Sequence, residues 1–555
     1  MAIVQSPFVI CKSVANDTYK DGPLHEKLMS HFDQYGDSPA CFDLESGVQY
    51  SYRQVREMSK SVANVLREKF NFSMGEIVAT YLENRAETFP VVLGTLAAGG
   101  AWTGINPGYT AEELRRHLDD SNSRILITRE GLLNTVKEAV KQLRPGQIKC
   151  IFLVETNAQF GANVRPITDL LLQSYEDFPV VNVNPENLAY LPYSSGTTGL
   201  PKGTMLSHKA LCQLVGHNSG IVGFQWDTGK WTVSVLPYFH IAGFGNLISA
   251  LYYGTPMAIL PKFDGNKYLS AITRFKAEAL LVVPSILNFF AKSDLVKKYD
   301  LSCIKRIFFG AAPAGAELLA QVKKQIPSVE SLCQLYGMTE IGIATVQPDV
   351  QGWDVPLASV GIVAPDVQMK VVSLDGQNTL LGPYMSGEIC AKTPAVMLGY
   401  LNKPEETRKT IDNDGWLHTG DIGYYDKSGF FYVVDRLKDL IKYKGFQVAP
   451  AELEDIILKH DSVDECAVTG IPDPNNVDVG ELPTAFVLLK KTASPTDQLA
   501  EDIKQLVARE AAAYKQLRGG VHFVSEIPKG GSGKILRRAF RDDPEKYKLK
   551  PKAKL

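Results

Sequence analysis

The sequence predicts an α/β protein with a large N-terminal domain and a small, mobile α+β C-terminal domain. Strand and helix patterns alternate from Tyr52 to Gly310, short strands and turns follow Val360, and a separate strand–helix unit begins after Asp435. A chain of 555 residues is long enough for more than one domain. We expect residues 1–434 to form the first domain, which includes a β-rich subdomain, 435–440 a hinge and 441–555 the second domain.

Apolar spacing predicts the elements of the first domain. Val55, Met58, Val62 and Leu66 recur at helical spacing, which indicates an amphipathic helix over 52–66. A nearly apolar helix is expected at 89–100, and Thr110 with Glu113 forms a capping box for the next helix. Short apolar runs bounded by turn residues predict strands at 77–82, 124–128, 187–191, 258–261, 279–284 and 306–310.

One uncharged stretch, 231–261, is long enough on length alone to span a bilayer. Its prolines and glycines divide it into strand, loop, short helix and strand, so we interpret it as buried core. In the second domain we expect strands near 465–471 and 484–489, and a helix over 496–513.

Composition excludes several functional classes. With 59 Lys and Arg against 61 Asp and Glu, the net charge is −2 and the isoelectric point about 6.5, which argues against a general nucleic-acid or membrane-surface binder. The eight cysteines form no CxxC pair, so a disulfide framework or zinc site is not expected and a reducing compartment fits. The N-terminal residues do not have the pattern of a secretory signal.

The stretch 193–203 combines glycines, hydroxyls and one cation between a predicted strand and a helix capped by Ser207. These donors are Ser194, Ser195, Gly196, Thr197, Thr198, Gly199, Lys202 and Gly203. Glycine lets backbone N–H groups turn toward an anion, so the loop suits a polyphosphate. It is not a Walker loop, because Pro201 directly precedes the lysine, and a plain surface loop is the alternative.

Two further segments carry groups suited to a nucleotide. Residues 334–340 offer the Tyr336 ring for a base, the Thr339 hydroxyl for a phosphate and the Glu340 carboxylate for Mg²⁺. Asp421 ends a tight turn where a carboxylate could hold a ribose diol, with Arg436 within chain reach. Taken alone, both could be structural turns.

The C-terminal part presents exposed lysines in two places. Lys438, Lys442 and Lys444 alternate along a strand, a pattern typical of a solvated edge. Lys534 lies in a glycine-flanked loop at 528–538, which could be a solvated basic patch.

In this order, the motifs from about residue 106 to 538 resemble those of the acyl-adenylate-forming (AMP-binding) superfamily, in particular 4-coumarate:CoA ligase-like and beetle luciferase-like members. The resemblance implies an ATP-dependent acyl-CoA synthetase. A carboxylic acid would be activated to acyl-AMP with release of pyrophosphate, and the acyl group would then pass to CoA. ATP, Mg²⁺ and CoA are the implied cofactors.

The resemblance also implies roles for individual residues. Catalysis would depend on Lys534, Thr339, Glu340, Lys202 and His240, with Glu340 as the magnesium ligand. ATP and AMP would be bound by Ser194, Ser195, Gly196, Thr197, Thr198, Gly199, Lys202, Gln334, Tyr336, Gly337, Thr339, Asp421, Arg436, Lys438, Lys442, Gln447 and Lys534. CoA would contact Lys262, Lys444 and Gly445, and the acyl group would contact His240, Ala242, Gly310, Ala311 and Leu335. A lone histidine such as His240 is otherwise more often a satisfied core residue.

Departures from the family pattern bear on the substrate. Ile241 and Leu214 stand where beetle luciferases have histidine and arginine, which argues against luciferin oxidation. Ala242 and Leu335 stand where hydroxycinnamate ligases usually have tyrosine and glycine, so a fatty or fatty-like acid is expected. A luciferase-like monooxygenase, a catalytically inactive nucleotide-binding homologue and a carrier-protein acceptor stay open as alternatives.

The sequence ends in Ala553-Lys554-Leu555, close to the Ser-Lys-Leu peroxisomal signal. We expect the peroxisomal import receptor as a partner and otherwise a cytoplasmic protein. The alternative is a basic, solvated tail.

Overall fold

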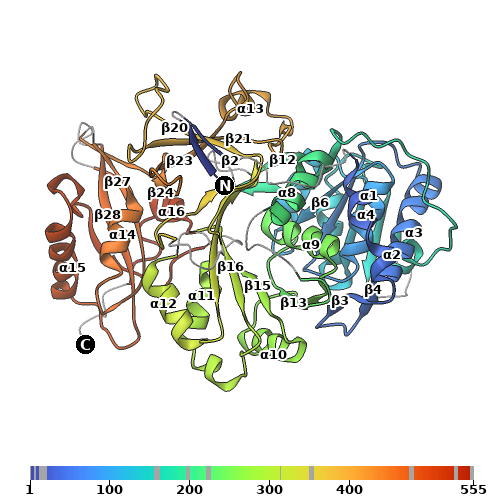
Figure 1. Ribbon diagram of the computed structural model, residues 1–555, viewed down its shortest axis with the longest axis horizontal. Helices are drawn as coiled ribbons and strands as arrows, with labels where there is room; N and C mark the ends of the chain where they lie inside the picture. The colour runs from blue at the N-terminus through green and yellow to red at the C-terminus, as the bar shows by residue number, and fades with distance from the viewer. Residues whose placement is uncertain are drawn as a thin grey trace. The chain divides into compact units, whose positions relative to one another are not determined.

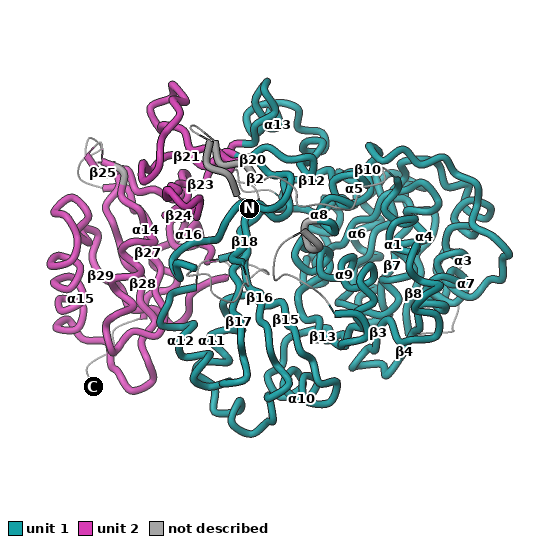
Figure 2. The backbone as a smooth tube through the Cα atoms, viewed as in Figure 1, with its two compact units in different colours: residues 1–3, 9–368, 391–417 teal, residues 4–8, 369–390, 418–555 magenta. Residues whose placement is uncertain are grey.

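The computed structural model describes residues 2–5, 8–11, 22–155, 163–195, 201–220, 227–312, 314–348, 355–444, 446–473, 480–529 and 535–549. The chain divides into two compact units (Figure 2). The first comprises residues 1–3, 9–368 and 391–417, and the second comprises 4–8, 369–390 and 418–555. The mixed α/β class is confirmed, whereas the boundaries expected at 434 and 440 stay predictions.

The main sheet of the first unit has a parallel core in the order β10-β6-β5-β7-β8-β9. Figure 1 labels its strand β6. Strands β5, β6 and β8 are buried at every position, which explains why they read as continuous rather than alternating apolar runs. The sheet contains β5 (Ile77–Tyr81), β6 (Ala101–Ile105), β7 (Ile125–Arg129), β8 (Cys150–Val154), β9 (Val164–Pro166), β10 (Leu188–Tyr190), β11 (Tyr193–Ser195), β12 (Pro201–Ser207) and β22 (Gly399–Tyr400).

Helices with buried apolar faces accompany this sheet. The predicted helix over 52–66 is confirmed as α3 (Tyr52–Phe70). The capping box is confirmed at α5 (Ala111–Ser121), where Glu113 N donates to Thr110 Oγ1 at 3.3 Å and Thr110 N donates to Glu113 Oε2 at 2.8 Å. The remaining helices here are α1 (Leu24–Met29), α2 (Phe32–Tyr35), α4 (Thr88–Ala97), η1 (Glu130–Leu132), α6 (Leu133–Val140) and α7 (Thr168–Leu171).

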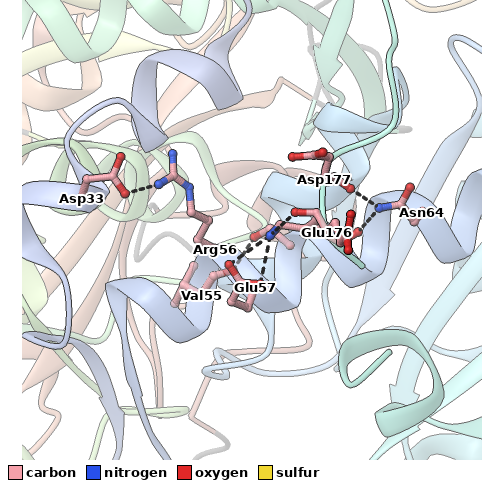
Figure 3. Close-up of polar contacts among 9 residues, drawn as sticks. Asp33, Val55, Arg56, Glu57, Asn64, Glu176 and Asp177 are labelled. Atoms are coloured by element: carbon pink, nitrogen blue, oxygen red, sulfur yellow. Dashed lines mark hydrogen bonds and ion pairs between the residues drawn. The ribbon is translucent and has the colours of Figure 1, made fainter. Parts of the chain in front are cut away.

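The polar side of α3 is tied to neighbouring segments (Figure 3). Arg56 forms an ion pair with Asp33, and Asn64 Nδ2 donates to the carbonyl oxygen of Asp177 at 2.8 Å. These two contacts attach the polar face of α3 to one segment before it and one after it in the chain. They add to the packing of its apolar face.

Two smaller sheets complete the first unit. The uncharged stretch is confirmed as a buried strand–helix–strand segment: β13 (Thr232–Ser234), α9 (Ile241–Tyr253) and β14 (Met257–Ile259). Among the helices of the described residues, none has both the length and the apolarity needed to cross a bilayer. The other elements are β3 (Pro39–Asp43), β4 (Gln49–Ser51), α8 (His208–Gly220), α10 (Gly265–Phe275), β15 (Ala279–Val282), α11 (Pro284–Lys292), η2 (Asp294–Lys298), β16 (Arg306–Phe309), α12 (Ala316–Gln325), β17 (Ser331–Met338), β18 (Gly342–Val346), β19 (Ile362–Val363) and α13 (Pro404–Thr410).

The second unit contains the β-rich segment together with the C-terminal elements. Its strands β20, β21, β23 and β24 lie side by side, and β27-β28-β29 form a separate sheet whose core includes Ile503 and Val507 of α15. The elements are β20 (Gln368–Val372), β21 (Gly387–Lys392), β23 (Leu417–Tyr425), β24 (Phe431–Arg436), β25 (Ile441–Tyr443), β26 (Phe446–Val448), α14 (Pro450–Ile457), β27 (Val463–Pro472), β28 (Glu481–Leu489), α15 (Asp497–Glu510), η4 (Ala513–Lys515), β29 (Gly520–Phe523) and α16 (Arg537–Asp542). Two short strands near the N-terminus are β1 (Ala2–Gln5) and β2 (Phe8–Cys11).

Candidate active site

The structure corrects the extent of the predicted phosphate loop. Lys202 and Gly203 lie in β12, paired with Ser194 and Tyr193 of β11, and not in the loop. The physical reason is that β12 pairs with β10 and β11 as well as with β22, so its backbone groups find partners in a sheet. Ser207 Oγ accepts a hydrogen bond from Ala210 N at 3.1 Å, as expected for a helix cap.

The part of this motif that lies outside the described residues comprises Gly196, Thr197, Thr198 and Gly199, together with the side chains of Ser194 and Ser195. Their roles stay predictions.

Lys202 is a buried cation with a defined partner. Its side chain is 7% exposed, and Nζ donates to Glu406 Oε2 at 2.5 Å. The Lys202 ammonium holds the pKa of Glu406 below its ordinary value. Nζ also lies 5.2 Å from the centre of the Tyr400 ring, because β12 pairs with β22 through Thr204 and Tyr400.

The same tyrosine contacts the predicted magnesium ligand. Glu340 is buried in the turn between β17 and β18, and Tyr400 donates to its Oε1 at 2.8 Å. Burial, and then the neighbouring Glu340 carboxylate, raises the pKa of Tyr400 well above its ordinary value. The structure therefore brings Lys202 and Glu340 to a single ring. The sequence pattern around Tyr400 and Glu406 carried no signal for this contact.

The residues before Glu340 form the end of β17. Gln334 lies in parallel register with Phe309 of β16, and Tyr336 pairs with Thr345 of β18. Gly337 is required for steric reasons, because a Cβ there would lie 2.0 Å from the carbonyl oxygen of Gly342.

Three of the residues expected to contact the acyl group, Gly310, Ala311 and Leu335, lie together at this end of the sheet. A Cβ on Gly310 would lie 2.8 Å from the carbonyl oxygen of Leu335. Ala311 follows in a left-handed conformation, φ +70°, which is uncommon for a residue other than glycine and is often found at functional sites.

His240 and Ala242 lie at the beginning of α9. His240 is the N-cap residue, and its Nε2 is buried without a hydrogen-bond partner in the described part of the chain. Burial lowers the pKa of His240 to about 4, so the imidazole is neutral near pH 7. The role of His240 as a gate stays a prediction.

Lys262 lies after β14 and is exposed. It lines a surface cavity of about 290 Å³ together with Leu44, Glu45, Leu260, Pro261, Phe263, Asp264 and Lys267.

In the second unit, the predicted pair Asp421 and Arg436 is brought together. The two residues are opposite each other in β23 and β24, and Arg436 Nε lies 2.9 Å from Asp421 Oδ1. Asp421 is almost fully buried, which is tolerated because its charge is paired.

The structure corrects the tight turn expected before Asp421, because Leu417–Tyr425 form strand β23. The backbone before Asp421 is held by a carboxylate that sequence reasoning missed. Glu388 of β21 accepts from Gly420 N at 3.0 Å, and its other oxygen lies 2.8 Å from Nδ1 of His418. Gly420 has φ +68° within β23, a backbone conformation that favours glycine. Hydrogen bonds with Cys390 and Glu388 raise the pKa of His418 to about 10. Both oxygens of Glu388 and Nδ1 of His418 therefore have hydrogen-bond partners among the described residues.

Three of the predicted lysines of the C-terminal part, Lys438, Lys442 and Lys444, are exposed and belong to the second unit. Lys438 follows β24, Lys442 lies in β25, and Lys444 has φ +47° at the end of the β25–β26 hairpin. The residues Gly445 and Lys534 lie outside the described residues, as does the side chain of Gln447.

Comparisons with known proteins identify the family. The model of the AMP-binding enzyme family matches residues 28–401, and that of the AMP-binding enzyme C-terminal domain matches residues 452–534. Among curated proteins, the chain is 36% identical over 544 residues to 4-coumarate–CoA ligase 1 of Petroselinum crispum, covering 96% of each chain. It is 37% identical over 520 residues to luciferin 4-monooxygenase of Luciola mingrelica, covering 92% of this chain and 91% of the relative.

The comparison with solved structures is consistent with this family. ATP-bound MatB from Rhodopseudomonas palustris is similar with a TM-score of 0.83 and 28% identity, covering 95% of this chain and 99% of that one. A fatty acyl CoA synthetase of Mycobacterium tuberculosis is similar with a TM-score of 0.72 and 26% identity, covering 94% and 98%. The expected enzyme class, an AMP-forming ligase, is confirmed. The chain belongs to the AMP-binding enzyme family, with both the large domain and the C-terminal domain of that family.

Proposed function

We propose that this enzyme converts a fatty or fatty-like acid to its acyl-CoA in two steps. A carboxylate oxygen attacks the α-phosphorus of ATP, the bond to pyrophosphate breaks, and acyl-AMP forms. The CoA sulfur then attacks the acyl carbon, the bond to the AMP oxygen breaks, and the thiol proton leaves to solvent. Negative charge builds on phosphate oxygens in the first step, so positioning and electrostatic stabilisation supply most of the catalysis.

The contact of both Lys202 and Glu340 with Tyr400 is the observation that carries this proposal. It joins a cation next to the phosphate loop to a buried carboxylate from the second nucleotide motif. Mg²⁺ prefers such oxygen ligands, and in the described part of the chain only the Tyr400 hydroxyl bonds to the Glu340 carboxylate, at Oε1. The site fits the ion, which when bound would neutralise charge on the phosphates.

The acid is inferred from the side chains expected around the acyl group. Leu335 is a half-buried aliphatic residue beside Gly310, and Ala242 leaves space at the first turn of α9. Small and aliphatic side chains favour a flexible apolar chain over a phenolic ring. The neutral His240, with its unpaired Nε2, is suited to donate or accept one hydrogen bond as a gate between the acid and the thiol.

A panel of carboxylic acids, assayed with and without CoA, tests the reaction. We expect AMP and pyrophosphate as products, with medium- or long-chain fatty acids preferred over hydroxycinnamates. ADP and phosphate as products would contradict the mechanism. Light emission with luciferin, ATP and O₂ would instead support the monooxygenase, and no turnover with any acid would support an inactive homologue.

The substitution Leu335→Gly tests the substrate assignment. Removing the side chain should shift the preference toward acids that are bulky near the carboxylate, by about 10–200-fold for a methylene-sized change. An unchanged acid profile would mean that Leu335 does not contact the acyl group.

We also propose a peroxisomal location, addressed by residues 553–555, which lie outside the described residues. The support is that these residues are close to the Ser-Lys-Leu tripeptide, which an import receptor recognises. Deleting these three residues from an N-terminally tagged protein should change a punctate distribution to a diffuse one, and an unchanged distribution would contradict the proposal.

A further inference from the structure

Tyr193, the first residue of the 193–203 motif, has a side chain to which the reaction proposed above gives no role. It lies in β11 opposite Gly203 of β12, and its ring is in contact with that glycine. A Cβ on Gly203 would be 3.0 Å from Cζ of Tyr193, so any larger residue there would press on the ring. The ring also contacts the imidazole of His117, with the two centroids 3.8 Å apart.

The hydroxyl of Tyr193 is held by two further side chains. It donates to Oδ2 of Asp120, in α5, at 2.7 Å, a short bond to a charged acceptor. Asn402, two residues after β22, donates from Nδ2 to Oδ1 and to the carbonyl oxygen of Asp120, both at 3.3 Å. Burial, and then the Asp120 carboxylate, raises the pKa of Tyr193 well above its ordinary value, so the hydroxyl keeps its proton and acts as a donor.

His117, in the same helix as Asp120, is fixed by the strands beside it. Thr103 Oγ1 of β6 donates its single hydrogen to the carbonyl oxygen of Leu191 at 2.6 Å, so it accepts from His117 Nε2 at 2.9 Å. Burial lowers the pKa of His117 to about 3, which keeps the imidazole neutral near pH 7. Helix α5 therefore contacts Tyr193 through two side chains three positions apart.

This network fixes the strand that carries Lys202. Gly203, opposite Tyr193, directly follows Lys202 in β12. The segment after β22 contacts the network through Asn402 and contacts Lys202 through Glu406, whose Oε2 lies 2.5 Å from Nζ. The strand of Lys202 and the partner of its ammonium are therefore both linked to the Tyr193 hydroxyl.

We propose that Tyr193, held by Asp120 and Asn402, is a positioning residue that sets Lys202 for the phosphates of ATP. The inference rests on the function proposed above, in which Lys202 meets the polyphosphate. A cation contributes most to anion binding when its position is fixed in advance, because less ordering is then needed on binding. Without the bond to Asp120, the nucleotide itself would have to order β12 and Lys202.

Binding of ATP to the full-length enzyme tests the proposal, measured by isothermal titration calorimetry with Mg²⁺ but without acid or CoA. Tyr193→Phe keeps the ring against Gly203 and removes only the hydroxyl, so it should raise the Kd for ATP about tenfold. Asp120→Ala should have a similar effect. Asp120→Asn retains an acceptor for the hydroxyl and should restore most of the affinity. In steady-state assays, KM for the acid and KM for CoA should stay at the wild-type values.

A double-mutant cycle separates positioning of Lys202 from a general loss of structure. If Tyr193 acts through Lys202, adding Tyr193→Phe to Lys202→Met should cause no further loss of ATP affinity. Tyr81→Phe is the matched control, because it removes a hydroxyl of the same sheet that donates to the carbonyl oxygen of Tyr109 at 2.7 Å. It should leave the Kd for ATP unchanged.

Several results would overturn the proposal. An unchanged Kd for ATP in Tyr193→Phe would show that the hydroxyl does not position Lys202. Additive losses in the double variant, the same loss in Tyr81→Phe, or an equal rise in KM for the acid would assign the hydroxyl to the stability of the fold. Because ATP binding is measured without acid or CoA, a wrong choice of acid or acceptor leaves this test intact. A wild-type enzyme that does not bind ATP would contradict both this proposal and the proposed function.

Discussion

At the scale of single residues, the candidate site depends on polar groups that hold one another in the interior. Glu340 and Lys202 are both buried, and each has a defined partner, Tyr400 and Glu406 respectively. A buried charge without a partner would be costly, so these partners position the groups expected to meet Mg²⁺ and phosphate.

Replacing Tyr400 by phenylalanine should weaken magnesium-dependent adenylation. The hydroxyl donates to a charged carboxylate, a bond worth about 1.5–3 kcal/mol, so we expect at least a tenfold higher Mg²⁺ concentration for half-maximal pyrophosphate release. Binding of Mn²⁺, followed by electron paramagnetic resonance, should weaken in parallel. Tyr253→Phe removes a hydroxyl that donates to a backbone carbonyl and should leave Mn²⁺ binding unchanged; equal effects of both substitutions would contradict a positioning role for Tyr400.

His418 predicts a pH dependence of stability. Its pKa is raised from 6.5 to about 10 by hydrogen bonds with Cys390 and Glu388. The protonated form is therefore favoured in the folded state. Its stabilisation is fully present below pH 6.5 and is lost as the pH rises through about 10.

The measurement is urea unfolding of the wild type and His418→Gln at several pH values. The difference in unfolding free energy should shrink between pH 7 and 10. His522→Gln is the control, because burial lowers the pKa of His522 and its charge does not change in this range. A difference that stays constant with pH would show that His418 is not protonated in the folded enzyme.

At the scale of secondary structure, local capping signals determine where helices begin. Thr110 and Glu113 form both hydrogen bonds of the capping box at α5, and Ser51 and Gln54 do the same at α3. Each side chain satisfies a backbone donor that the helix itself leaves open.

Thr110→Ala should lower the unfolding free energy by about 1 kcal/mol, since the Glu113 amide loses its acceptor. Thr110→Ser retains the hydroxyl and should be close to the wild type. Chemical denaturation followed by circular dichroism compares the two variants. Equal losses would point to the threonine methyl group rather than to the cap.

At the scale of the whole molecule, the second unit holds residues expected to serve different half-reactions. Lys534 and Lys444 both belong to this unit, yet the first is expected to act in adenylation and the second in thiol transfer. One placement of the unit cannot easily serve both, so we predict that it rotates about Lys438 between the steps.

Separate assays of the two half-reactions check this prediction. Lys534→Ala should slow adenylation by about 10²–10³-fold, the usual effect of losing one electrostatic donor, and leave transfer from supplied acyl-AMP nearly intact. Lys438→Pro should impair transfer more than adenylation, because proline fixes φ at the pivot. Equal losses in both steps would indicate one static arrangement.

The sequence by itself determined features that depend on neighbouring residues and on short motifs. Apolar periodicity located α3, and the capping box located the start of α5. The motifs from about residue 106 to 538, taken together and in order, indicated the family that the comparisons confirm. Local rules suffice there, because helix caps and amphipathic faces involve residues three or four positions apart.

Only the tertiary structure decided which distant groups meet. Lys202 is expected in a loop, but its pairing with Ser194 of β11 places it in strand β12. The pairing of β12 with β22 brings it beside Tyr400, 198 positions later in the chain. Glu388 of β21 accepts a hydrogen bond from the backbone of Gly420 in β23. Such contacts arise from sheet register and from the need to pair buried charges, and neither leaves a local pattern in the sequence.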